Sequence, residues 1–409
     1  MMREEIGNHL KQKLIPFWRA LHDPEYGGFY GYVDHDLSVH KDAEKGCILM
    51  SRITWFFSGA YRLLQDPALL DEARHGYHFL KQHCFDEEYG GVYWSVTCDG
   101  TPLDTIKHTY NQAFTIYALA SYYDVSGDEE ALVRALTLFH LIEEKMKDEG
   151  GYLEAFDRMF RPAGNDKLSE NGVEAGRTMN THLHVMEAYT ELLRVLSANG
   201  DGIASEKDRL LVWKALYGIC GIFLKKMWNP GKGRVEVFFD RDWHPLIDLW
   251  SSGHDIESSW LCDRAVEILK EAAGTPEEAW AAGDMADAMY AVTSEMARQV
   301  YRKAFAKDSV ISEFENGLAA PGRIWWVQAE AVVGFLNAWG KAPERSEYRE
   351  AARKVWAFIK TRFLDPRDGS EWFWDLTEDL EPTDQPIVEP WKCPYHNGRM
   401  CFEAARRLA

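Results

Sequence analysis

A short signature of glycine followed by aromatic residues recurs along the chain, and no other feature restricts the fold as strongly. In each copy a glycine turn precedes aromatic residues that alternate with small or polar ones, a pattern that predicts a short strand or hairpin. The five copies are GGFYGYVD at 27–34, GGVYWSV at 90–96, GGYLEAFD at 150–157, GRVEVFFD at 233–240 and GSEWFWDL at 369–376. The wide gap before the last copy leaves room for a sixth, degenerate unit near ENGLAAPGRIWW at 315–326. The sequence therefore predicts six structural repeats.

Two kinds of helix are predicted between the signatures. One kind has apolar residues at three- and four-residue spacing and a charged opposite face, as in DEARHGYHFLKQHC and EYREAARKVWAFIKTRF. The other kind is apolar or small around most of its circumference, as expected of a helix buried on all sides. Segments of this second kind are SRITWFFSGAYRLL, TYNQAFTIYALASYY, TMNTHLHVMEAYTELL, HDIESSWLCDRAVEIL, WWVQAEAVVGFLNAW and HNGRMCFEAARRL. Two helices per repeat predict an all-α fold, an (α/α)6 barrel of twelve helices with short β-hairpins in the connecting loops, and residues 1–409 as one domain.

Composition and charge exclude several classes of protein. A hydrophobic fraction of 46% and an aromatic fraction of 13% indicate a large buried core rather than disorder. The net charge of −19, without a dense run of Lys and Arg, argues against nucleic acid and anionic membranes as partners. The N-terminal MMREEIGNHLKQKL predicts a charged amphipathic helix rather than a signal peptide or membrane span, and seven cysteines without a CxxC pair fit reduced thiols. We expect a cytoplasmic protein that is a monomer or a weak homodimer.

The unusual polar residues of the chain fall at the starts of the six predicted inner helices. They are Arg52, Tyr110, Asn180 with His184, His254 with Glu257, Trp326 with Glu330, and His396. The members of each pair lie three or four residues apart, so they share one face of their helix. Helix N-termini carry partial positive charge, which favours oxyanions and developing negative charge. We therefore predict that the six N-termini converge on a cup at one end of the barrel and that this cup is the site.

The residue types in the predicted cup favour proton transfer. Imidazole titrates closest to neutral pH, a nearby carboxylate can orient the ring, and an arginine can hold an oxygen that becomes negative when the adjacent carbon loses a proton. The sequence has no HExxH pattern, no tight Cys/His cluster, no glycine-rich phosphate loop and no GxSxG elbow, so we expect neither a metal nor a nucleotide cofactor. Aromatic rings suit the apolar faces of sugars, and those near the cup are Tyr110, Trp326, Trp391 and Tyr395.

Some of these residues also have a purely structural interpretation. A single histidine on an apolar helix is usually a hydrogen-bonded core residue, and we expect that role for His182. Three histidines at equivalent helix starts instead favour a functional site. Trp325 and Trp326 must face different ways, and Glu330, four residues further on, favours Trp326 for the cup.

Several long motifs together resemble the cellobiose 2-epimerase family, within the N-acylglucosamine 2-epimerase superfamily. They cover essentially the whole chain and are SRITWFF at 51–57, KHTYNQAF at 107–114, TMNTHLHVMEAY at 178–189, GHDIESSW at 253–260, RIWWVQAEAVVGF at 323–335 and PWKCPYHNGRMC at 390–401. The resemblance implies an (α/α)6 barrel that epimerises carbon 2 of the reducing-end glucose in β-1,4-linked disaccharides without metal or nucleotide. Cellobiose would become glucosyl-mannose, and lactose would become epilactose.

The resemblance also implies roles for residues of the cup. His254 and His396 match an acid/base pair that removes and returns the proton at carbon 2 through an enediol-type intermediate, and His184 matches a third histidine that assists ring opening. Substrate-holding positions are matched by Arg52, Tyr110, Asn180, Glu257, Trp326 and Glu330, and the aromatic platform by Trp391. The chain departs from the family at Ser252, where an aromatic residue is common, and in the loop 240–252.

Four other functions are weighed beside this one. N-acylglucosamine 2-epimerases usually lack the HDIE and PYHNGRM motifs, so that activity is the second candidate. A mannose isomerase would reprotonate carbon 1 of the same intermediate. A glycoside hydrolase would need a carboxylate pair, for which Asp255 with Glu257 or Glu330 is the candidate. A sugar-binding protein without catalysis would show no turnover.

Overall fold

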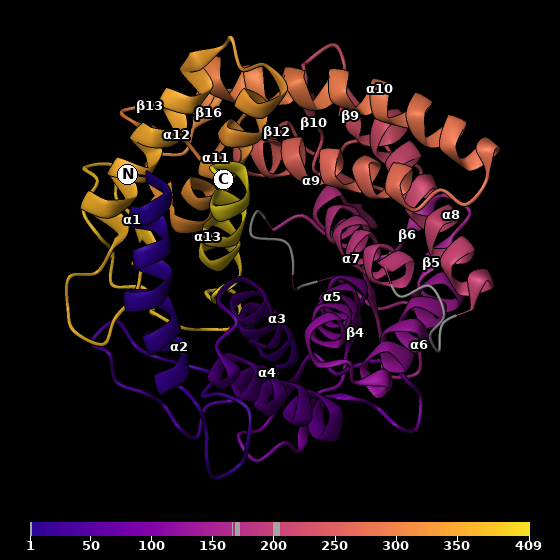
Figure 1. Ribbon diagram of the computed structural model, residues 1–409, viewed down its shortest axis with the longest axis vertical. Helices are drawn as coiled ribbons and strands as arrows, with labels where there is room; N and C mark the ends of the chain where they lie inside the picture. The colour runs from indigo at the N-terminus through magenta and orange to yellow at the C-terminus, as the bar shows by residue number, and fades with distance from the viewer. Residues whose placement is uncertain (1, 166, 168–171, 199–204) are drawn as a thin grey trace.

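Two concentric rings of helices make up the molecule, as Figure 1 shows. The computed structural model describes residues 2–165, 167, 172–198 and 205–409. The inner ring consists of α3 (Cys47–Leu64), α5 (Thr109–Ser126), α7 (Met179–Ala198), α9 (Ser252–Glu271), α11 (Trp325–Lys341) and α13 (Tyr395–Arg407). The outer ring consists of α1 (Met2–His9) continued by α2 (Ile15–Ala20), α4 (Pro67–Phe79), α6 (Glu129–Lys145), α8 (Glu206–Ile222), α10 (Pro276–Gln299) and α12 (Ser346–Phe358). Six inner and six outer helices in the described part of the chain confirm the predicted (α/α)6 barrel.

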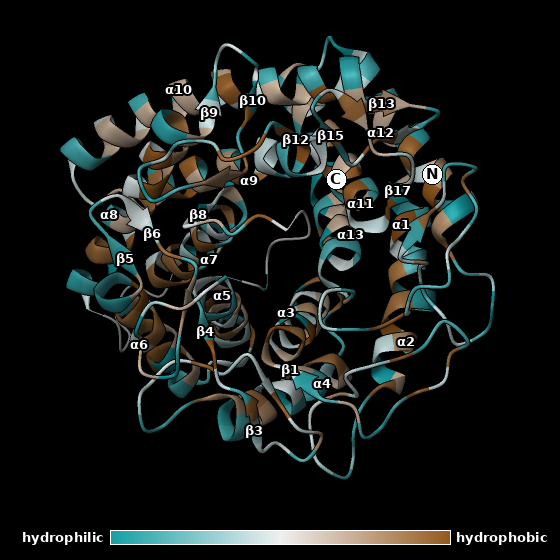
Figure 2. Ribbon diagram, turned by 180° about the vertical axis from the view of Figure 1, so that it is seen from behind, coloured by the Kyte–Doolittle hydropathy of each residue, from teal (hydrophilic) through white to brown (hydrophobic). Residues whose placement is uncertain are grey.

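Burial separates the two rings. In α11, 13 of 17 residues are buried, whereas in the neighbouring α12 only six of 13 are. The outer helices α8 and α10 alternate between hydrophilic and hydrophobic residues along their length (Figure 2), as helices with one solvated face do. Each inner helix contacts the next one around the ring, and α13 closes the ring against α3. In the described residues no helix is long and apolar enough to cross a bilayer.

A small β-hairpin follows each outer helix, in agreement with the predicted repeat. The six pairings, all antiparallel, are His22 with Phe29, Phe85 with Val92, Lys147 with Tyr152, Trp228 with Val235, Phe305 with Val310 and Leu364 with Trp372. The predicted position of the sixth unit near 315–326 is wrong, because the equivalent hairpin lies upstream at 305–310. Its turn is formed by Lys307 and Asp308, both at positive φ (53° and 60°), where the first two copies have glycines. The signature is lost because non-glycine residues adopt the left-handed backbone here.

The fourth residue of four inner helices ties that helix to a hairpin. Its side chain bonds to the backbone of the hairpin's second strand. The pairs are Gln112 with Val92, His182 with Tyr152, Asp255 with Val235 and Gln328 with Val310. His182 also bonds through Nδ1 to the Thr178 carbonyl oxygen, 2.8 Å away. The predicted structural role of His182 is therefore confirmed.

An extra three-stranded sheet lies beside the start of α9. It is formed by β12 (Leu249–Ser251), β15 (Glu313–Glu315) and β16 (Leu318–Ala319), with β15 in the middle. The Trp250 ring stacks on Phe314 with centroids 4.9 Å apart. Ser252, where the resemblance leads us to expect an aromatic residue, is fully buried and donates through Oγ to the carbonyl oxygens of Ile311 and Ser312. A serine at this position therefore anchors the sheet instead of presenting an aromatic ring.

Candidate active site

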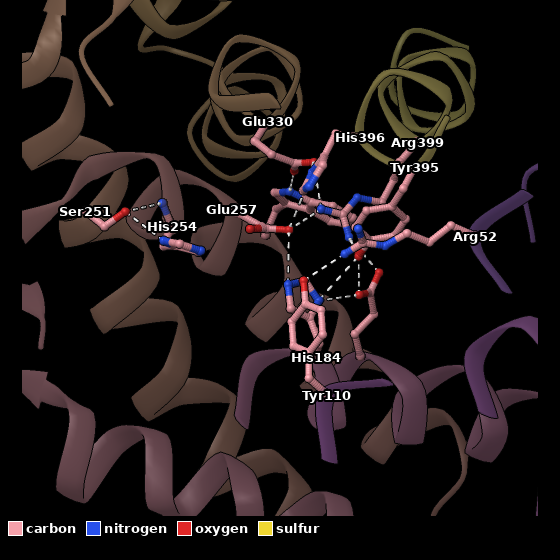
Figure 3. Close-up of polar contacts among 12 residues, drawn as sticks. Arg52, Tyr110, His184, Ser251, His254, Glu257, Glu330, Tyr395, His396 and Arg399 are labelled. Atoms are coloured by element: carbon pink, nitrogen blue, oxygen red, sulfur yellow. Dashed lines mark hydrogen bonds and ion pairs between the residues drawn. The ribbon is translucent and has the colours of Figure 1, made fainter. Parts of the chain in front are cut away.

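A cavity of about 200 Å³ opens at the end of the barrel where the inner helices begin. Nine of the ten predicted site residues line it: Arg52, Tyr110, Asn180, His184, His254, Glu257, Trp326, Trp391 and His396. The tenth, Glu330, lies beneath the cavity and reaches His396 from α11 (Figure 3). Residues from all six inner helices or the segments just before them thus meet at one place, as the cup hypothesis predicts.

His396, the second residue of α13, is oriented by a carboxylate. Its Nδ1 lies 2.8 Å from Glu330 Oε1, so the ring nitrogen that remains for a ligand is Nε2. Burial, aided by the positive charges of Arg399 and Arg52, holds the pKa of His396 well below its ordinary value. The ring is therefore neutral at physiological pH and can accept a proton through Nε2.

His254, the third residue of α9, is oriented by a hydroxyl group instead. Its Nδ1 lies 2.7 Å from Ser251 Oγ, and burial lowers the pKa of His254 to about 3. The Trp326 ring lies against both histidines, with its centroid 4.8 Å from that of His254 and 5.3 Å from that of His396. Both Trp325 and Trp326 line the cavity: Trp325 is almost fully buried and packs against Trp372 and His396, whereas Trp326 is partly exposed. The two imidazoles therefore border one indole ring in the cavity.

His184 on α7 is the third imidazole of the site. Glu187, one turn later, places Oε2 2.9 Å from His184 Nδ1, and Glu257 Oε1 lies 4.0 Å from its Nε2. Burial lowers the pKa of His184, while the ion-pair partner Glu187 opposes the shift. All three histidines of the cavity are thus biased toward the neutral form.

Arg52 is held rigidly at the cavity wall. Its Nη2 donates to Tyr110 OH at 2.7 Å and its Nη1 to Cys393 Sγ at 3.7 Å, while the guanidinium carbon lies 4.1 Å from the centre of the Phe114 ring. Trp391 stands beside Tyr110, with ring centroids 5.9 Å apart. The cation and the aromatic rings form one wall suited to a polyhydroxylated ring.

Asn180 adds a buried acceptor to the cavity lining. Among the described residues its Oδ1 has no hydrogen-bond partner. A buried amide oxygen without a partner is costly, so a ligand hydroxyl that donates to it would be favoured.

Arg399, which the sequence analysis did not select, is the centre of the hydrogen-bond network under the cavity (Figure 3). Its Nη1 donates to Glu187 Oε1 at 2.6 Å and to Tyr395 OH, and its Nη2 donates to Glu330 Oε1 at 2.6 Å and to Glu257 Oε1. One guanidinium therefore connects three carboxylates from α7, α9 and α11. The signal that identifies it is its place three residues after His396 on a helix that is buried for its first seven residues.

Three potential metal ligands of the site already face a cation. Ligand atoms of Glu257, Glu330 and His396 lie within 4.8 Å of one another. Arg399 donates to both carboxylates and supplies a positive charge to the group. A second acidic group in the described residues, Asp240 with Asp242 and His244, belongs to a surface loop, where Asp240 accepts hydrogen bonds from the other two residues.

Comparisons with known proteins agree along the full length of the chain. Residues 27–398 match the family model described as N-acylglucosamine 2-epimerase (GlcNAc 2-epimerase). The cellobiose 2-epimerase of Eubacterium cellulosolvens is 47% identical over 409 residues and covers 98% of each chain. A sugar epimerase from a ruminal bacterium has a solved structure that matches with a TM-score of 0.92 and 44% identity over 100% of both chains. The cellobiose 2-epimerase of Bacillus thermoamylovorans matches with a TM-score of 0.90 and 41% identity over 99% of both.

Proposed function

Because the chain belongs to the N-acylglucosamine 2-epimerase family, we propose that it inverts carbon 2 of the reducing-end glucose in β-1,4-linked disaccharides. Family membership and the similarity to sugar epimerases establish the broader activity, that of a carbohydrate epimerase, an isomerase that acts on a sugar. The narrower substrates in the proposal are cellobiose, converted to glucosyl-mannose, and lactose, converted to epilactose. Their support is the cellobiose 2-epimerase activity for which the similar proteins are named.

The reaction that we propose begins with ring opening, because the proton at carbon 2 becomes acidic only beside a free carbonyl group. His184 assists this step. One of His254 and His396, in its neutral form, then removes the proton from carbon 2, and the bonding electrons move toward oxygen 1. The other histidine, which takes up a proton from solvent, delivers it to the opposite face, and the first histidine releases its proton to solvent. Arg52 stabilises the charge that develops on oxygen, and no net proton is gained or lost.

The relative positions of His254 and His396 are the main support for this proposal. His254 and His396 border the same Trp326 ring, come from different helices, and have their Nδ1 atoms occupied by Ser251 and Glu330. Each therefore has its Nε2 atom for the substrate. Inversion at a planar carbon needs proton access from both faces, and two imidazoles on different helices provide it.

In this proposal the remaining cavity residues bind the sugar. Trp391 and Trp326 contact the apolar faces of the sugar, and hydroxyl groups bond to Arg52, Tyr110, Asn180 and Glu257. Glu330 acts through His396, whose Nδ1 it contacts, and reaches the sugar only indirectly. We also propose that residues 1–409 form one catalytic domain that needs neither metal nor nucleotide.

Proton NMR of separate sugars with purified protein tests the function directly. Cellobiose, lactose, glucose, mannose and N-acetylglucosamine are each incubated with EDTA-dialysed protein, with and without ATP. We expect glucosyl-mannose from cellobiose and epilactose from lactose, without a requirement for ATP. A ketose as the main early product would instead indicate an aldose–ketose isomerase, free glucose a hydrolase, and turnover of N-acetylglucosamine alone an N-acylglucosamine 2-epimerase.

A further inference from the structure

The three carboxylates around Arg399 are not equivalent in their hydrogen bonds. Glu187 accepts from Arg399 on Oε1 and from Tyr395 and His184 on Oε2. Glu330 accepts from His396 and Arg399 on Oε1 and from the Trp260 indole nitrogen on Oε2 at 2.9 Å. Every oxygen of these two groups therefore faces a donor, which is the environment of an ionised carboxylate.

Glu257 differs from both at one oxygen. Its Oε1 accepts from Arg399, but its Oε2 is buried and has no hydrogen-bond partner in the described part of the chain. In Figure 3 this oxygen carries no dashed line and is turned toward the side of the view where His254 lies. Glu257 also lines the cavity, which Glu187 and Glu330 do not. An ionised oxygen left without donors in a buried site is strongly disfavoured, whereas a protonated one can donate to a ligand.

The charge balance requires the same assignment. Three buried carboxylates share the guanidinium of Arg399, so full ionisation would place three negative charges around that one positive charge, beside neutral histidines. Burial would raise the pKa of Glu187, but Arg399 and His184 hold it at about 2. Burial raises the pKa of Glu330, and it raises that of Glu257 to about 8, with Arg399 opposing both shifts. Because Glu330 has donors on both oxygens and Glu257 does not, the proton belongs to Glu257.

We propose that Glu257 is a neutral carboxylic acid that donates a hydrogen bond from Oε2 to oxygen 1 of the opened sugar and stabilises the enediolate. This role rests on the epimerase function proposed above. As the C2–H bond breaks, its proton moves to a histidine, its electron pair forms the C1=C2 bond, and the C1=O1 π electrons move to oxygen 1. Glu257 and Arg52 hold the resulting negative charge. When the second histidine, which takes up a proton from solvent, protonates carbon 2, the electrons return and Glu257 keeps its proton throughout.

A neutral carboxyl group can act as an oxyanion donor in this way when its surroundings keep it protonated at neutral pH. The charged and titratable groups that face Glu257 come from four neighbouring helices. They are Tyr110 of α5, His184 and Glu187 of α7, Glu330 of α11, and Tyr395, His396 and Arg399 of α13. Arg52 of α3 and His254 of α9 line the same cavity. Since the raised pKa belongs to an acid, the donor is present below about pH 8 and is lost as the pH rises through that value.

Two substitutions of Glu257 separate a neutral donor from a carboxylate. Glu257→Gln keeps an oxygen for Arg399 and places an NH₂ donor where Oε2–H was, so we expect kcat within about tenfold of wild type. Glu257→Leu removes the donor, and we expect kcat to fall by about 10² to 10³, the usual cost of one oxyanion donor. Wild-type kcat should also decline above about pH 8, and the Glu257→Gln enzyme should lack that alkaline decline. If Glu257→Gln is as inactive as Glu257→Leu while both are folded, or if it keeps the alkaline decline, the proposal is overturned.

Infrared spectroscopy gives a readout that does not depend on turnover. The difference spectrum between wild type and Glu257→Gln at pH 7 should contain the carbonyl stretch of a protonated carboxylic acid, and that band should disappear above about pH 8. A carboxylate band at pH 7 would contradict the assignment. Glu154 is a suitable control, because burial raises its pKa to about 7 although it lies outside the cavity. The carbonyl band in the difference spectrum between wild type and Glu154→Gln should therefore stay at the same frequency when sugar is added. A wild-type protein that shows the Glu257 band but epimerises no sugar would refute the proposed function and leave the proton assignment standing.

Discussion

Glu330 Oε1 lies 2.8 Å from His396 Nδ1, across the boundary between helices α11 and α13. The second oxygen of Glu330 is held by the Trp260 indole nitrogen, so the carboxylate cannot rotate away. A carboxylate in this position keeps the imidazole proton on Nδ1 and leaves Nε2 as the base. The same pair stabilises the imidazolium that forms when His396 takes a proton from the sugar.

Replacing Glu330 by glutamine should therefore reduce kcat and leave KM nearly unchanged. The amide oxygen can still accept from Nδ1, but the negative charge that stabilises the imidazolium is gone, and we expect a loss of about 10 to 100-fold within the range of acid/base contributions. Steady-state kinetics on cellobiose measure the two parameters. Glu403→Gln, at a partly buried glutamate near the C-terminal end of α13 that pairs with Arg406 and Arg407, is the matched control. A raised KM with unchanged kcat would show that Glu330 holds the sugar directly instead.

Trp326 should govern substrate affinity, because its ring borders both histidines and part of it is exposed to the cavity. We expect Trp326→Ala to raise KM about tenfold or more and Trp326→Phe to raise it less, since an aromatic face contributes about 1 kcal/mol beyond the area that it buries. Trp280→Ala is the control, because the Trp280 side chain is 75% exposed on the outer helix α10, and its KM should equal that of the wild type. Equal KM values for all three variants would remove Trp326 from the binding site.

Arg399 should stabilise the folded protein far more than a surface arginine does. Arg399 reaches Glu187 from Nη1 and Glu257 with Glu330 from Nη2. The single ammonium nitrogen of lysine cannot occupy both positions, so Arg399→Lys leaves buried carboxylates without a donor, at a cost of about 3 to 5 kcal/mol in the free energy of unfolding. Urea denaturation followed by circular dichroism measures this cost. Arg406 pairs with Glu403 on the same helix and is exposed. Arg406→Lys should therefore change the free energy of unfolding by less than about 0.5 kcal/mol. Similar effects of the two substitutions would argue against the central role of Arg399.

The protein should lose stability progressively as the pH falls below 6.5. Burial lowers the pKa of His9, His182 and His254 from 6.5 to about 3, so the unfolded chain binds more protons than the folded one between these values. Each such histidine weakens folding by about 1 kcal/mol per pH unit in that window.

Thermal unfolding of His182→Gln across pH 8 to 5 isolates one of these contributions. Glutamine makes the equivalent contact in two other repeats, at Gln112 and Gln328, so the variant should fold and show a shallower decline of the midpoint in acid. His78→Gln, whose histidine side chain is exposed on α4, should leave the slope nearly unchanged. An unchanged slope for His182→Gln would mean that this imidazole is not kept neutral by folding.

The fold was predictable because the repeat is visible in the sequence. Glycine turns and alternating helix patterns mark five units, and they specify the number of helices and which ones are inner. The sixth turn escaped detection because Lys307 and Asp308 occupy backbone conformations that sequence patterns associate with glycine. The three-stranded sheet around β15 was also missed, since its pairing joins Trp250 to Phe314 across more than sixty residues, and no local pattern encodes such a pairing.

The cavity lining was predictable for a different reason: each residue occupies an equivalent place at the start of an inner helix. The groups beneath it were not. Ser251, Glu187 and Arg399 have no chemistry of their own that distinguishes them in a sequence, and their importance arises from contacts between helices. The family resemblance implies that Glu330 holds the substrate, whereas the structure places it behind His396.

Hydrogen–deuterium exchange at carbon 2, measured separately for each epimer in heavy water, tests the two-histidine proposal most directly. Cellobiose and glucosyl-mannose are incubated singly with the wild type, His254→Ala and His396→Ala, and the carbon-2 proton is followed by NMR. We predict that the wild type exchanges and interconverts both sugars, whereas neither variant interconverts them. Each variant should still exchange one epimer through its remaining histidine, and the two variants should exchange opposite epimers. Net epimerisation by either variant at a rate near that of the wild type, or exchange of the same epimer by both, would contradict a mechanism with one histidine on each face of carbon 2.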